Sequence, residues 1–338
     1  MSSERSLGIG IVGFGFMGRT HARAYRAAAG TGRANRIVAI ADADPARLED
    51  GGARGNLEGE AATPLFDPRE TAIVAKAEEL FANEAVDAVS LCTPTDTHVE
   101  LAIAALRAGK HVLVEKPVAL AARDVERLAA VARGTQKLCM PAMCLRFWPG
   151  WRWLRQAIER GSHGTVKSAV FRRLASPPSW SADFYRDARR SGGALFDLHV
   201  HDADLVRWLF GEPTSVHATG SLDHVTACYR FERGPAHVVA EGGWDHTGGF
   251  PFHMGYTVVF EQATAEYAFG RTPPLLLHQE GTARGLPLEE GTGYDGEIRH
   301  FLDCCAGKSV LEATIDEAVG LTRMLEAERA CVEGGTPR

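Results

Sequence analysis

A glycine-rich stretch follows the first apolar run of the chain and reads Gly13-Phe-Gly15-Phe16-Met17-Gly18. This G-x-G-x-x-G spacing binds the pyrophosphate of a dinucleotide when it joins a strand to a helix. We predict that Gly13 permits the tight turn, Gly15 lets the backbone approach the phosphates and Gly18 allows close packing of the helix on the strand. The helix that follows, expected over Thr20–Ala29, would supply amides and a positive dipole end, so Phe16 and Met17 complete the predicted cofactor-binding turn.

A carboxylate follows the second apolar run, Ile37–Ala41. Asp42 stands directly after it, 24 residues beyond Gly18. An acid at this place can hold the ribose 2′-hydroxyl of NAD and repel the 2′-phosphate of NADP. We therefore expect NAD, with NADP as the alternative because Arg47 is close enough to be recruited to a phosphate. Asp44 is expected to cap the helical turn Pro45-Ala-Arg-Leu.

The first 145 residues alternate between strand-like and helix-like segments. Continuous apolar runs separated by helices are typical of a parallel sheet covered on both faces. Residues 51–64 are glycine-rich and polar and are expected to be a surface loop. The sequence therefore predicts a six-stranded doubly wound sheet of the Rossmann type. The sequence locates five of these strands, namely Leu7–Val12, Ile37–Ala41, Ala88–Cys92, His111–Val114 and Lys137–Cys144, and its clearest helices are Thr97–Ala108 and Arg123–Ala132.

The pattern changes after Phe147, where short strands follow one another with short turns. This succession indicates a largely antiparallel open sheet in an α+β domain. We place the first domain at 1–146 and the second at 147–338, with the possibility that the last helix, Thr314–Glu333, packs back on the first domain. The expected elements are the helix Trp151–Arg160 and the strands Val166–Leu174, Val216–Thr219, Thr226–Phe231, Ala236–Glu241, Tyr256–Phe260 and Ala265–Phe269.

The composition of the 338 residues excludes several classes of function. Apolar residues make up 45% and charged residues 24%, which is typical of a soluble globular protein. The net charge of −6 has the wrong sign for a protein that neutralises nucleic-acid phosphates. The sequence shows no apolar stretch long enough to span a membrane and no signal peptide, and its seven cysteines form no C-x-x-C pair. We therefore expect a cytoplasmic protein with reduced thiols, no nucleic-acid partner and no membrane partner.

Further segments, in this order after the glycine-rich turn, resemble the glucose–fructose oxidoreductase / inositol dehydrogenase (Gfo/Idh/MocA) family. They are Cys92-Thr93-Pro94-Thr95-Asp-Thr-His98, Glu115-Lys116-Pro117 and Gly192-Gly-Ala-Leu-Phe-Asp197-Leu-His199-Val-His201-Asp-Ala-Asp204. The resemblance covers nearly the whole chain and is loosest between about Ser215 and Gly293. It implies a Rossmann domain, a second domain whose open sheet forms homodimers or homotetramers, and a cofactor-bound cleft between the two.

The resemblance also implies roles for individual residues. Thr93, Pro94 and His98 would line the nicotinamide side, and Glu115 would contact the cofactor region. Lys116 would reach the substrate hydroxyl or carbonyl, with Asp197 and His201 completing the catalytic group. Arg146, which matches an Arg-Phe segment of the family, would approach the nicotinamide. The family often has glycine where this chain has His199, so a second imidazole is a candidate for the site.

The residue types suit hydride transfer between a nicotinamide and a secondary alcohol or ketone. That reaction needs a proton acceptor and a group that stabilises the developing alkoxide. His201 is the natural acid/base because imidazole titrates near neutral pH. Asp197, four residues earlier on an expected helix, would orient the ring. Lys116 follows a strand at the edge of the sheet where such folds bind ligands, so we expect it to be the electrostatic and proton partner, with a cis bond to Pro117.

Alternatives remain for the function. The run from Asp197 to Asp204 alternates histidines and acids, so on a strand it would present metal ligands on one face, although we expect no metal. The preferred hypothesis is an NAD(P)-dependent oxidoreductase acting on a small polyhydroxylated substrate, namely a sugar, a sugar derivative, an inositol or the corresponding keto compound. The alternatives are an NAD-dependent glycosidase of the same architecture and a non-catalytic cofactor-binding regulator.

Overall fold

The computed structural model describes residues 5–48, 65–179 and 181–334, and the chain forms two compact units. The first unit contains the chain up to Cys144 together with Gly293–Val319, and the second contains Leu145–Thr292 together with the residues from Gly320 onward. The sequence prediction divided the chain once, after residue 146, and so placed Gly293–Val319 in the second domain. The surface loop expected at 51–64 lies outside the described residues.

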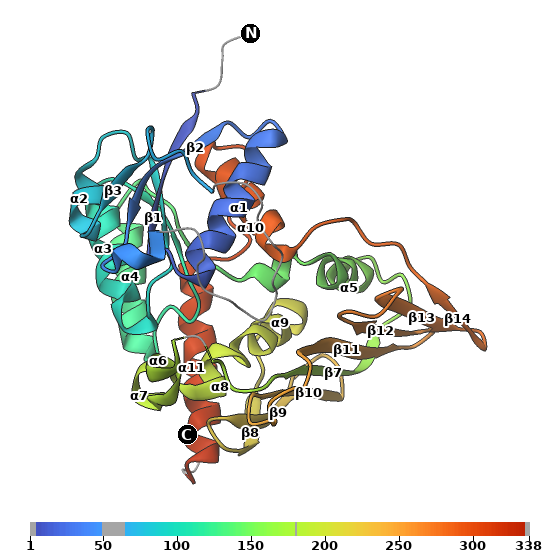
Figure 1. Ribbon diagram of the computed structural model, residues 1–338. Helices are drawn as coiled ribbons and strands as arrows, with labels where there is room; N and C mark the ends of the chain where they lie inside the picture. Colours follow the sequence, from blue (N-terminus) through green and yellow to red (C-terminus); the bar gives the residue numbers. More distant parts are fainter. Residues whose placement is uncertain (1–4, 49–64, 180, 335–338) are drawn as a thin grey trace. The chain divides into compact units, whose positions relative to one another are not determined.

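A parallel sheet forms the centre of the first unit (Figure 1). Its strands in the described part of the chain lie in the order β3-β2-β1-β4-β5-β6, and every neighbouring pair is parallel. This confirms the predicted doubly wound sheet of six strands. The strands are β1 Leu7–Val12, β2 Asn35–Ala41, β3 Ala72–Val74, β4 Ala88–Leu91, β5 His111–Val114 and β6 Cys139–Pro141.

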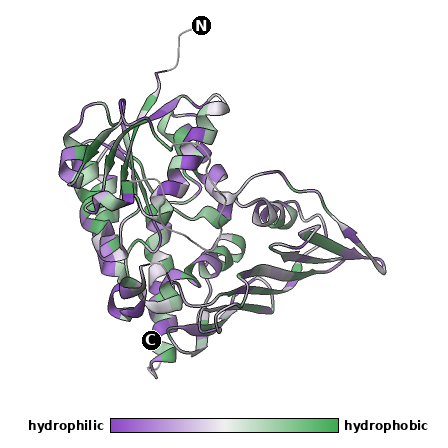
Figure 2. Ribbon diagram, viewed as in Figure 1, coloured by the Kyte–Doolittle hydropathy of each residue, from purple (hydrophilic) through white to green (hydrophobic). Residues whose placement is uncertain are grey.

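Helices cover both faces of this sheet (Figure 1). α1 (Phe16–Gly30) packs with α10 (Gly293–Cys305) on one face, and α2 (Ala77–Ala82), α3 (His98–Arg107) and α4 (Ala122–Arg133) lie on the other. Because both faces are covered, β4 is buried along its whole length and β1 and β5 beyond their first residues. This explains why these strands read as unbroken apolar runs, shown as hydrophobic ribbons in Figure 2. Short 3₁₀ turns occupy Pro45–Leu48 (η1), Thr95–Thr97 (η2) and Cys144–Phe147 (η3).

The second unit is built on a sheet whose described strands lie in the order β14-β13-β12-β11-β7-β10-β9-β8. All neighbouring pairs are antiparallel except β7 and β10, so the largely antiparallel prediction is confirmed. The last two strands were missed in the sequence. The strands are β7 Val166–Leu174, β8 Ser215–Gly220, β9 His224–Arg230, β10 His237–Gly243, β11 His253–Phe260, β12 Thr264–Ala268, β13 Leu275–Gln279 and β14 Thr282–Gly285.

One face of this sheet carries helices and an aromatic core. Trp151 packs edge-on against Tyr256 and Tyr267, with ring centroids 5.7 and 4.6 Å apart, and the Tyr256 hydroxyl donates a hydrogen bond to the Gly150 carbonyl at 2.8 Å. This contact fastens α5 to the sheet. The helices of the unit are α5 Pro149–Glu159, α6 Ala182–Arg186, α7 Ala188–Ser191, α8 Gly193–Asp197 and α9 Val200–Phe210, and α11 Ile315–Val332 begins in the first unit and continues into the second.

The helices are short relative to a bilayer. Over the described residues, none combines the length and apolar character that a membrane crossing requires.

The start of α1 depends on the absence of a side chain at Gly18. A Cβ added there would lie 2.1 Å from the Gly13 carbonyl oxygen, which is far inside van der Waals contact. A Cβ added at Gly30, the last residue of the same helix, would meet no described atom within 4 Å. An alanine side chain is therefore expected to clash at Gly18 and to fit at Gly30, so the two positions make a matched comparison.

We predict that Gly18→Ala destabilises the protein by roughly 1–3 kcal/mol, because the glycine turn must distort to admit the methyl group. Gly30→Ala is expected to be neutral or to stabilise by up to about 1 kcal/mol, because alanine reduces the freedom of the unfolded chain. Denaturation midpoints of both variants and the wild type measure the difference. Equal midpoints for the two variants would contradict the close approach.

Candidate functional site

The glycine turn between β1 and α1 has the geometry of a phosphate-binding loop. Gly13 has a φ of +84°, a left-handed conformation suited to glycine, and a Cβ there would lie 2.6 Å from the Cys92 carbonyl oxygen. Gly15, Phe16 and Met17 are partly exposed, and a Cβ on Gly15 would meet only Arg47 Nη1, at 4.0 Å, among the described atoms. The turn can therefore bring its backbone close to a ligand.

The helix after the turn begins at Phe16, four residues earlier than predicted, and carries no acidic residue in its first turn. The first amides of a helix have no acceptor within the helix and lie at its positive end, so this turn suits an anion. The residues present thus fit the pyrophosphate of a dinucleotide. Gly13 and Gly15 lie in the turn, and Phe16, Met17 and Gly18 form the first turn of α1 instead of preceding the helix.

Asp42 is buried at the end of β2 instead of being a solvated acid. Its Oδ2 accepts a hydrogen bond from the Phe14 amide at 2.6 Å, and its Oδ1 accepts one from the Asp44 amide at 2.9 Å. The carboxylate therefore ties β2 to the glycine turn and holds a fixed position next to it. Asp44 in turn accepts a hydrogen bond from the Ala46 amide at 3.1 Å, which confirms the predicted cap of η1.

One arginine lies close to this carboxylate, and a second contacts the first. Arg47 Nη1 is 3.8 Å from Asp42 Oδ2, and Arg19 Nη2 donates to the Arg47 carbonyl at 2.8 Å. The Arg19 guanidinium also stacks over the Phe14 ring, 5.2 Å from its centroid. A carboxylate at this place would suit a free ribose hydroxyl, whereas Arg47 would suit a 2′-phosphate.

His98 connects the segments that follow β4 and β5. Its Nδ1 lies 2.9 Å from the Pro117 carbonyl oxygen and its Nε2 lies 2.7 Å from the Thr93 carbonyl oxygen. Burial lowers the pKa of the ring, more than these carbonyls raise it. The resemblance implied that His98 lines the nicotinamide side, but both ring nitrogens face backbone carbonyls. The structure therefore places His98 where it braces the residues next to Lys116.

Lys116 lies two residues beyond the carboxyl end of β5, as Thr93 and Pro94 lie just beyond β4. Its bond to Pro117 is cis, as predicted, and its side chain is partly exposed. The carboxyl ends of neighbouring parallel strands meet at one edge of a sheet, where open α/β folds bind their ligands. The glycine turn lies at the same edge, because it follows β1.

Glu115, the residue before Lys116, is the centre of a buried polar chain. Its Oε1 lies 3.1 Å from His21 Nε2, its Oε2 accepts a hydrogen bond from the Lys116 amide at 3.0 Å, and the other ring nitrogen of His21 lies 3.5 Å from Cys92 Sγ. Burial would raise the pKa of Glu115, but the hydrogen bond and charge of His21, with the charge of Lys116, bring it below the ordinary value. The carboxylate thus fixes the backbone of Lys116.

Glu297 is a buried acid that the sequence analysis missed. It lies in α10, and neither of its carboxyl oxygens has a hydrogen-bond partner among the described residues. Burial raises its pKa well above the ordinary glutamate value, and the negative charge of Glu115 raises it further. Its burial could have been predicted from the sequence, because Glu297 lies beside Ile298 and four residues before Phe301 on an apolar helical face.

We predict that the acid form of Glu297 makes stability depend on pH. Because its folded pKa is raised, its contribution is fully present below the unfolded pKa and is lost as the pH rises toward the folded pKa. Glu297→Gln keeps the shape without a titrating proton. The variant should therefore be more stable than the wild type at pH 7–8, with no advantage near pH 4.

Thermal unfolding of Glu297→Gln and wild type between pH 4 and 8 measures this dependence, with Glu290→Gln, an exposed acid, as the control. A constant difference between Glu297→Gln and wild type across that range would show that Glu297 does not titrate as described.

Asp197 and His201 occupy the junction of two helices in the second unit. Asp197 is the last residue of α8 and His201 is the second residue of α9, so the single helix expected for the pair is interrupted at Leu198 and His199. Both side chains are partly exposed, unlike most of their neighbours. The segment is helical on both sides of this junction. The strand arrangement on which the metal interpretation of 197–204 depended is therefore wrong.

Two buried ion pairs hold α9 in place. Arg146 Nε and Nη2 donate to the two oxygens of Asp204 at 2.8 and 2.6 Å, and Arg173 Nε and Nη2 donate to the two oxygens of Asp202 at 2.8 and 3.3 Å. All four side chains are at most 3% exposed. Arg146 was expected to approach the nicotinamide. In the structure its guanidinium is instead buried in an ion pair with Asp204.

His199 belongs to a third buried polar group. Its Nε2 lies 3.0 Å from Glu328 Oε2 in α11 and 3.2 Å from the Tyr229 hydroxyl, which donates to Glu328 Oε1 at 2.8 Å. Its Cβ packs so closely on β10 that a Cβ at Gly242 would lie 2.7 Å from it. The ring is fully buried. His199 therefore tethers the start of α9 instead of adding an imidazole to the site.

We predict that Asp202→Ala destabilises the protein by about 3–5 kcal/mol, because Arg173 would stay buried without a counter-charge. The double variant Arg173→Met/Asp202→Ala should recover most of this loss. Glu212→Ala, which removes the exposed partner of Arg207, should change stability by no more than about 1 kcal/mol. Chemical denaturation of the variants measures these differences. A double variant as unstable as Asp202→Ala alone would argue against charge burial as the cause.

A cavity of about 580 Å³ opens in the second unit beside Trp244. Tyr185 packs edge-on against Trp244 at 5.7 Å, and the Trp244 indole donates to Asp223 at 2.8 Å. Flat aromatic rings beside charged groups suit a polar, ring-shaped ligand. The lining residues are Pro177, Pro178, Ser179, Tyr185, Arg186, Ala188, Asp223, Trp244 and Asp245.

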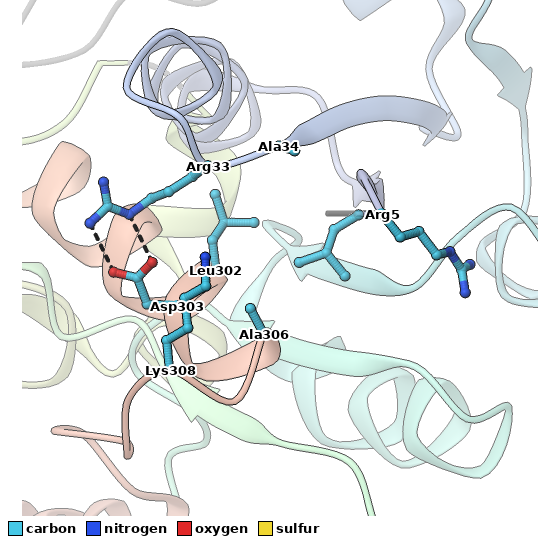
Figure 3. A pocket seen from close by; sticks show the side chains of 8 residues that line it. Arg5, Arg33, Ala34, Leu302, Asp303, Ala306 and Lys308 are labelled. Carbon is cyan, nitrogen blue, oxygen red and sulfur yellow. Dashed lines mark hydrogen bonds and ion pairs between the residues drawn. The ribbon is translucent and has the colours of Figure 1, made fainter. Parts of the chain in front are cut away.

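A smaller hollow of about 230 Å³ lies in the first unit, next to the beginnings of β1 and β2 (Figure 3). Leu7, the first residue of β1, and Ala34, which directly precedes β2, line it. This puts the hollow at the opposite edge of the sheet from the glycine turn. Arg33 faces the hollow but donates two hydrogen bonds of 2.9 Å to Asp303. The hollow is therefore a different site from the cofactor turn, because it lies at the other edge of the sheet and its Arg33 is paired with Asp303.

Comparisons with known proteins agree with these two units. Residues 7–143 match the model of an oxidoreductase family with an NAD-binding Rossmann fold, and residues 151–266 match the GFO/IDH/MocA C-terminal domain. The inositol 2-dehydrogenase of Rhizobium meliloti (strain 1021) is 37% identical over 218 residues, which are 63% of this chain and 58% of that protein. The chain thus spans less than two thirds of this relative.

Solved structures share the whole fold. Levoglucosan dehydrogenase in complex with NADH and levoglucosan aligns over 98% of both chains, with a TM-score of 0.80 and 21% identity. UDP-N-acetylglucosamine 3-dehydrogenase from Acidithiobacillus ferrooxidans aligns over 98% of this chain and 99% of its own, with a TM-score of 0.78 and 23% identity. At these identities the likeness establishes the fold.

Proposed function

Because this chain belongs to the Gfo/Idh/MocA oxidoreductase family, whose N-terminal domain is an NAD-binding Rossmann fold, we propose that it oxidises or reduces a polyhydroxylated substrate. The reaction is hydride transfer between a nicotinamide and a secondary alcohol or ketone. The observation that carries this proposal is the combination of an open glycine turn with Lys116 at the same edge of the sheet. A glycine turn without such a lysine would support cofactor binding but not a catalysed reaction.

The cofactor is proposed to be NAD, with NADP as the alternative. When bound, it supplies the acceptor or donor for the hydride. Gly13, Gly15 and the first turn of α1 would hold its phosphates, and Asp42, already fixed by two backbone amides, would accept the ribose hydroxyl. The proximity of Arg47 keeps NADP as the alternative.

We assign proton transfer to His201 and charge stabilisation to Lys116. The ammonium of Lys116 would stabilise the alkoxide as it develops, since its backbone is fixed by Glu115 and its neighbour Pro117 by His98. His201 would take or return the hydroxyl proton, and Asp197 would orient its ring and stabilise the imidazolium. Thr93, Pro94 and Glu115 are proposed to shape the nicotinamide side, with His98 as a positioning residue.

A sugar, a sugar derivative or an inositol is the proposed substrate class. The cavity beside Trp244 supports it, because aromatic rings can pack on the apolar faces of a sugar while Arg186 and Asp223 pair with its hydroxyls. A site that hydrogen-bonds many hydroxyls rejects analogues that lack one, because its own polar groups would then lose their partners. The curated relative named above is an inositol dehydrogenase, which agrees with this class.

Two alternatives make different predictions. An NAD-dependent glycosidase of the same architecture would oxidise its substrate transiently and release no net NADH. A cofactor-binding regulator would bind the nucleotide without turnover and would not need Lys116, Asp197 and His201 together. We further propose a homodimer or homotetramer formed through the open sheet, as the resemblance implies. A cytoplasmic location is proposed because all seven cysteines are free thiols.

The test begins with NAD and NADP binding by tryptophan fluorescence, followed by absorbance of the reduced nicotinamide with a panel of sugars, polyols and inositols. We expect NAD binding and turnover of one polyol class. Binding without net NADH on any member, together with release of sugar from a glycoside, would favour the glycosidase. Failure to bind either nucleotide would overturn the proposal.

With an active substrate, Lys116→Ala and His201→Ala are each expected to lower kcat by about 10²–10⁴-fold while NAD binding stays within a few-fold of wild type. The reason is that these groups act on the reacting hydroxyl and not on the cofactor phosphates. His237→Ala, which alters an exposed histidine of β10, is the control and should keep full activity. Unchanged kcat in both Lys116→Ala and His201→Ala would refute the assigned roles.

A further inference from the structure

Three potential metal ligands meet at one end of the second sheet. His224 is the first residue of β9, and Asp245 and His246 follow the end of β10. One ligand atom from each of the three lies within 4.8 Å of the other two. Sequence spacing did not reveal the group, because His224 is 21 residues from Asp245 and the antiparallel pairing of β9 with β10 brings them together.

The distances suit donors arranged around an ion. Asp245 Oδ1 lies 2.7 Å from His224 Nδ1 and 3.6 Å from His246 Nδ1. Two ligands at the usual zinc distances and tetrahedral angles stand about 3.3 Å apart. The second distance is too long for a hydrogen bond but close to this value, and the first needs to open by about half an ångström.

Hydrogen bonding does not account for the buried ring nitrogen of His246. Its Nδ1 is buried and has no hydrogen-bond partner among the described residues, although it is directed toward Asp245. Its ring is held in place by stacking on Phe250, with centroids 4.1 Å apart and planes 26° apart. A buried nitrogen held beside a carboxylate and a second imidazole is a typical metal ligand.

A second layer of residues orients the first. His224 Nε2 lies 3.2 Å from Glu241 Oε1, and the other oxygen of Glu241 accepts a hydrogen bond from Arg172 at 2.7 Å. A ligating histidine usually donates its second N–H to a carboxylate in this way. The Nδ1 of His224 also lies 2.7 Å from a carboxylate oxygen, so its proton must leave when Nδ1 coordinates an ion. The layer is therefore already in place without the ion.

We propose that His224, Asp245 and His246 bind a divalent transition-metal ion, with Zn²⁺ as the ion of choice for two imidazoles and one carboxylate. Three protein ligands leave at least one coordination position for water or another oxygen ligand. Because Asp245 also lines the 580 Å³ cavity, the ion would lie at the edge of that cavity. The proposal concerns binding alone and does not depend on the proposed reaction.

The test uses full-length protein without an affinity tag, stripped by a chelator and titrated with Co²⁺ and then Zn²⁺. We expect one Co²⁺ per chain, visible absorption from a nitrogen- and oxygen-ligated site, displacement of Co²⁺ by Zn²⁺, and a higher unfolding temperature with Zn²⁺. Asp245→Asn and His246→Ala should each abolish the visible bands. Glu241→Gln should weaken binding by about 10–100-fold, because it disturbs the orientation of His224.

His237→Ala is the matched control, since it removes an exposed histidine of the same sheet outside the group. It should bind Co²⁺ like the wild type. Circular dichroism of each variant without metal establishes that it is folded. Absence of Co²⁺ binding by the wild type, or binding that Asp245→Asn and His246→Ala leave unchanged, would overturn the proposal.

Discussion

The two guanidinium groups of Arg146 and Arg173 are almost completely buried, and a charge in such surroundings is tolerated only when a counter-charge meets it with good geometry. Asp204 and Asp202 supply that geometry from positions two residues apart in α9. The pairs therefore leave the helix little freedom to rotate or slide. The junction between α8 and α9, which holds Asp197 and His201, inherits this fixed orientation.

In the first unit, too, buried polar contacts fix the backbone beside a residue proposed to do chemistry. Glu115 is held by His21 on one oxygen and holds the Lys116 amide with the other, and His98 joins the neighbouring segments through two carbonyls. In both units, then, the groups proposed to do chemistry are partly exposed, while the buried polar groups next to them fix the backbone. A proton-transfer group gains from this, because misplacement by an ångström is costly in rate.

The sequence was informative where local rules decide the structure. The glycine turn, the parallel sheet and the cap at Asp44 follow from residue spacing, backbone freedom and apolar runs, and all three were predicted. The side-chain partners of buried polar residues were not predictable in this way. Arg146 meets Asp204 across 58 residues, and His199 meets Glu328 on the last described helix, so their surroundings are set by the fold. The group around Asp245 was missed for the same reason, whereas Glu297 was missed although its place on an apolar helical face could be read from the sequence.

The division of the chain has a consequence for its biosynthesis. The first unit is completed by Gly293–Val319, and the second by residues from Gly320 onward, including Glu328. Domains of a nascent chain generally fold in order as they leave the ribosome. Here the first unit is completed only when residue 319 has been translated, and the second only after that. The face of α1 that packs on α10 therefore stays uncovered until residues 293–305 have been synthesised.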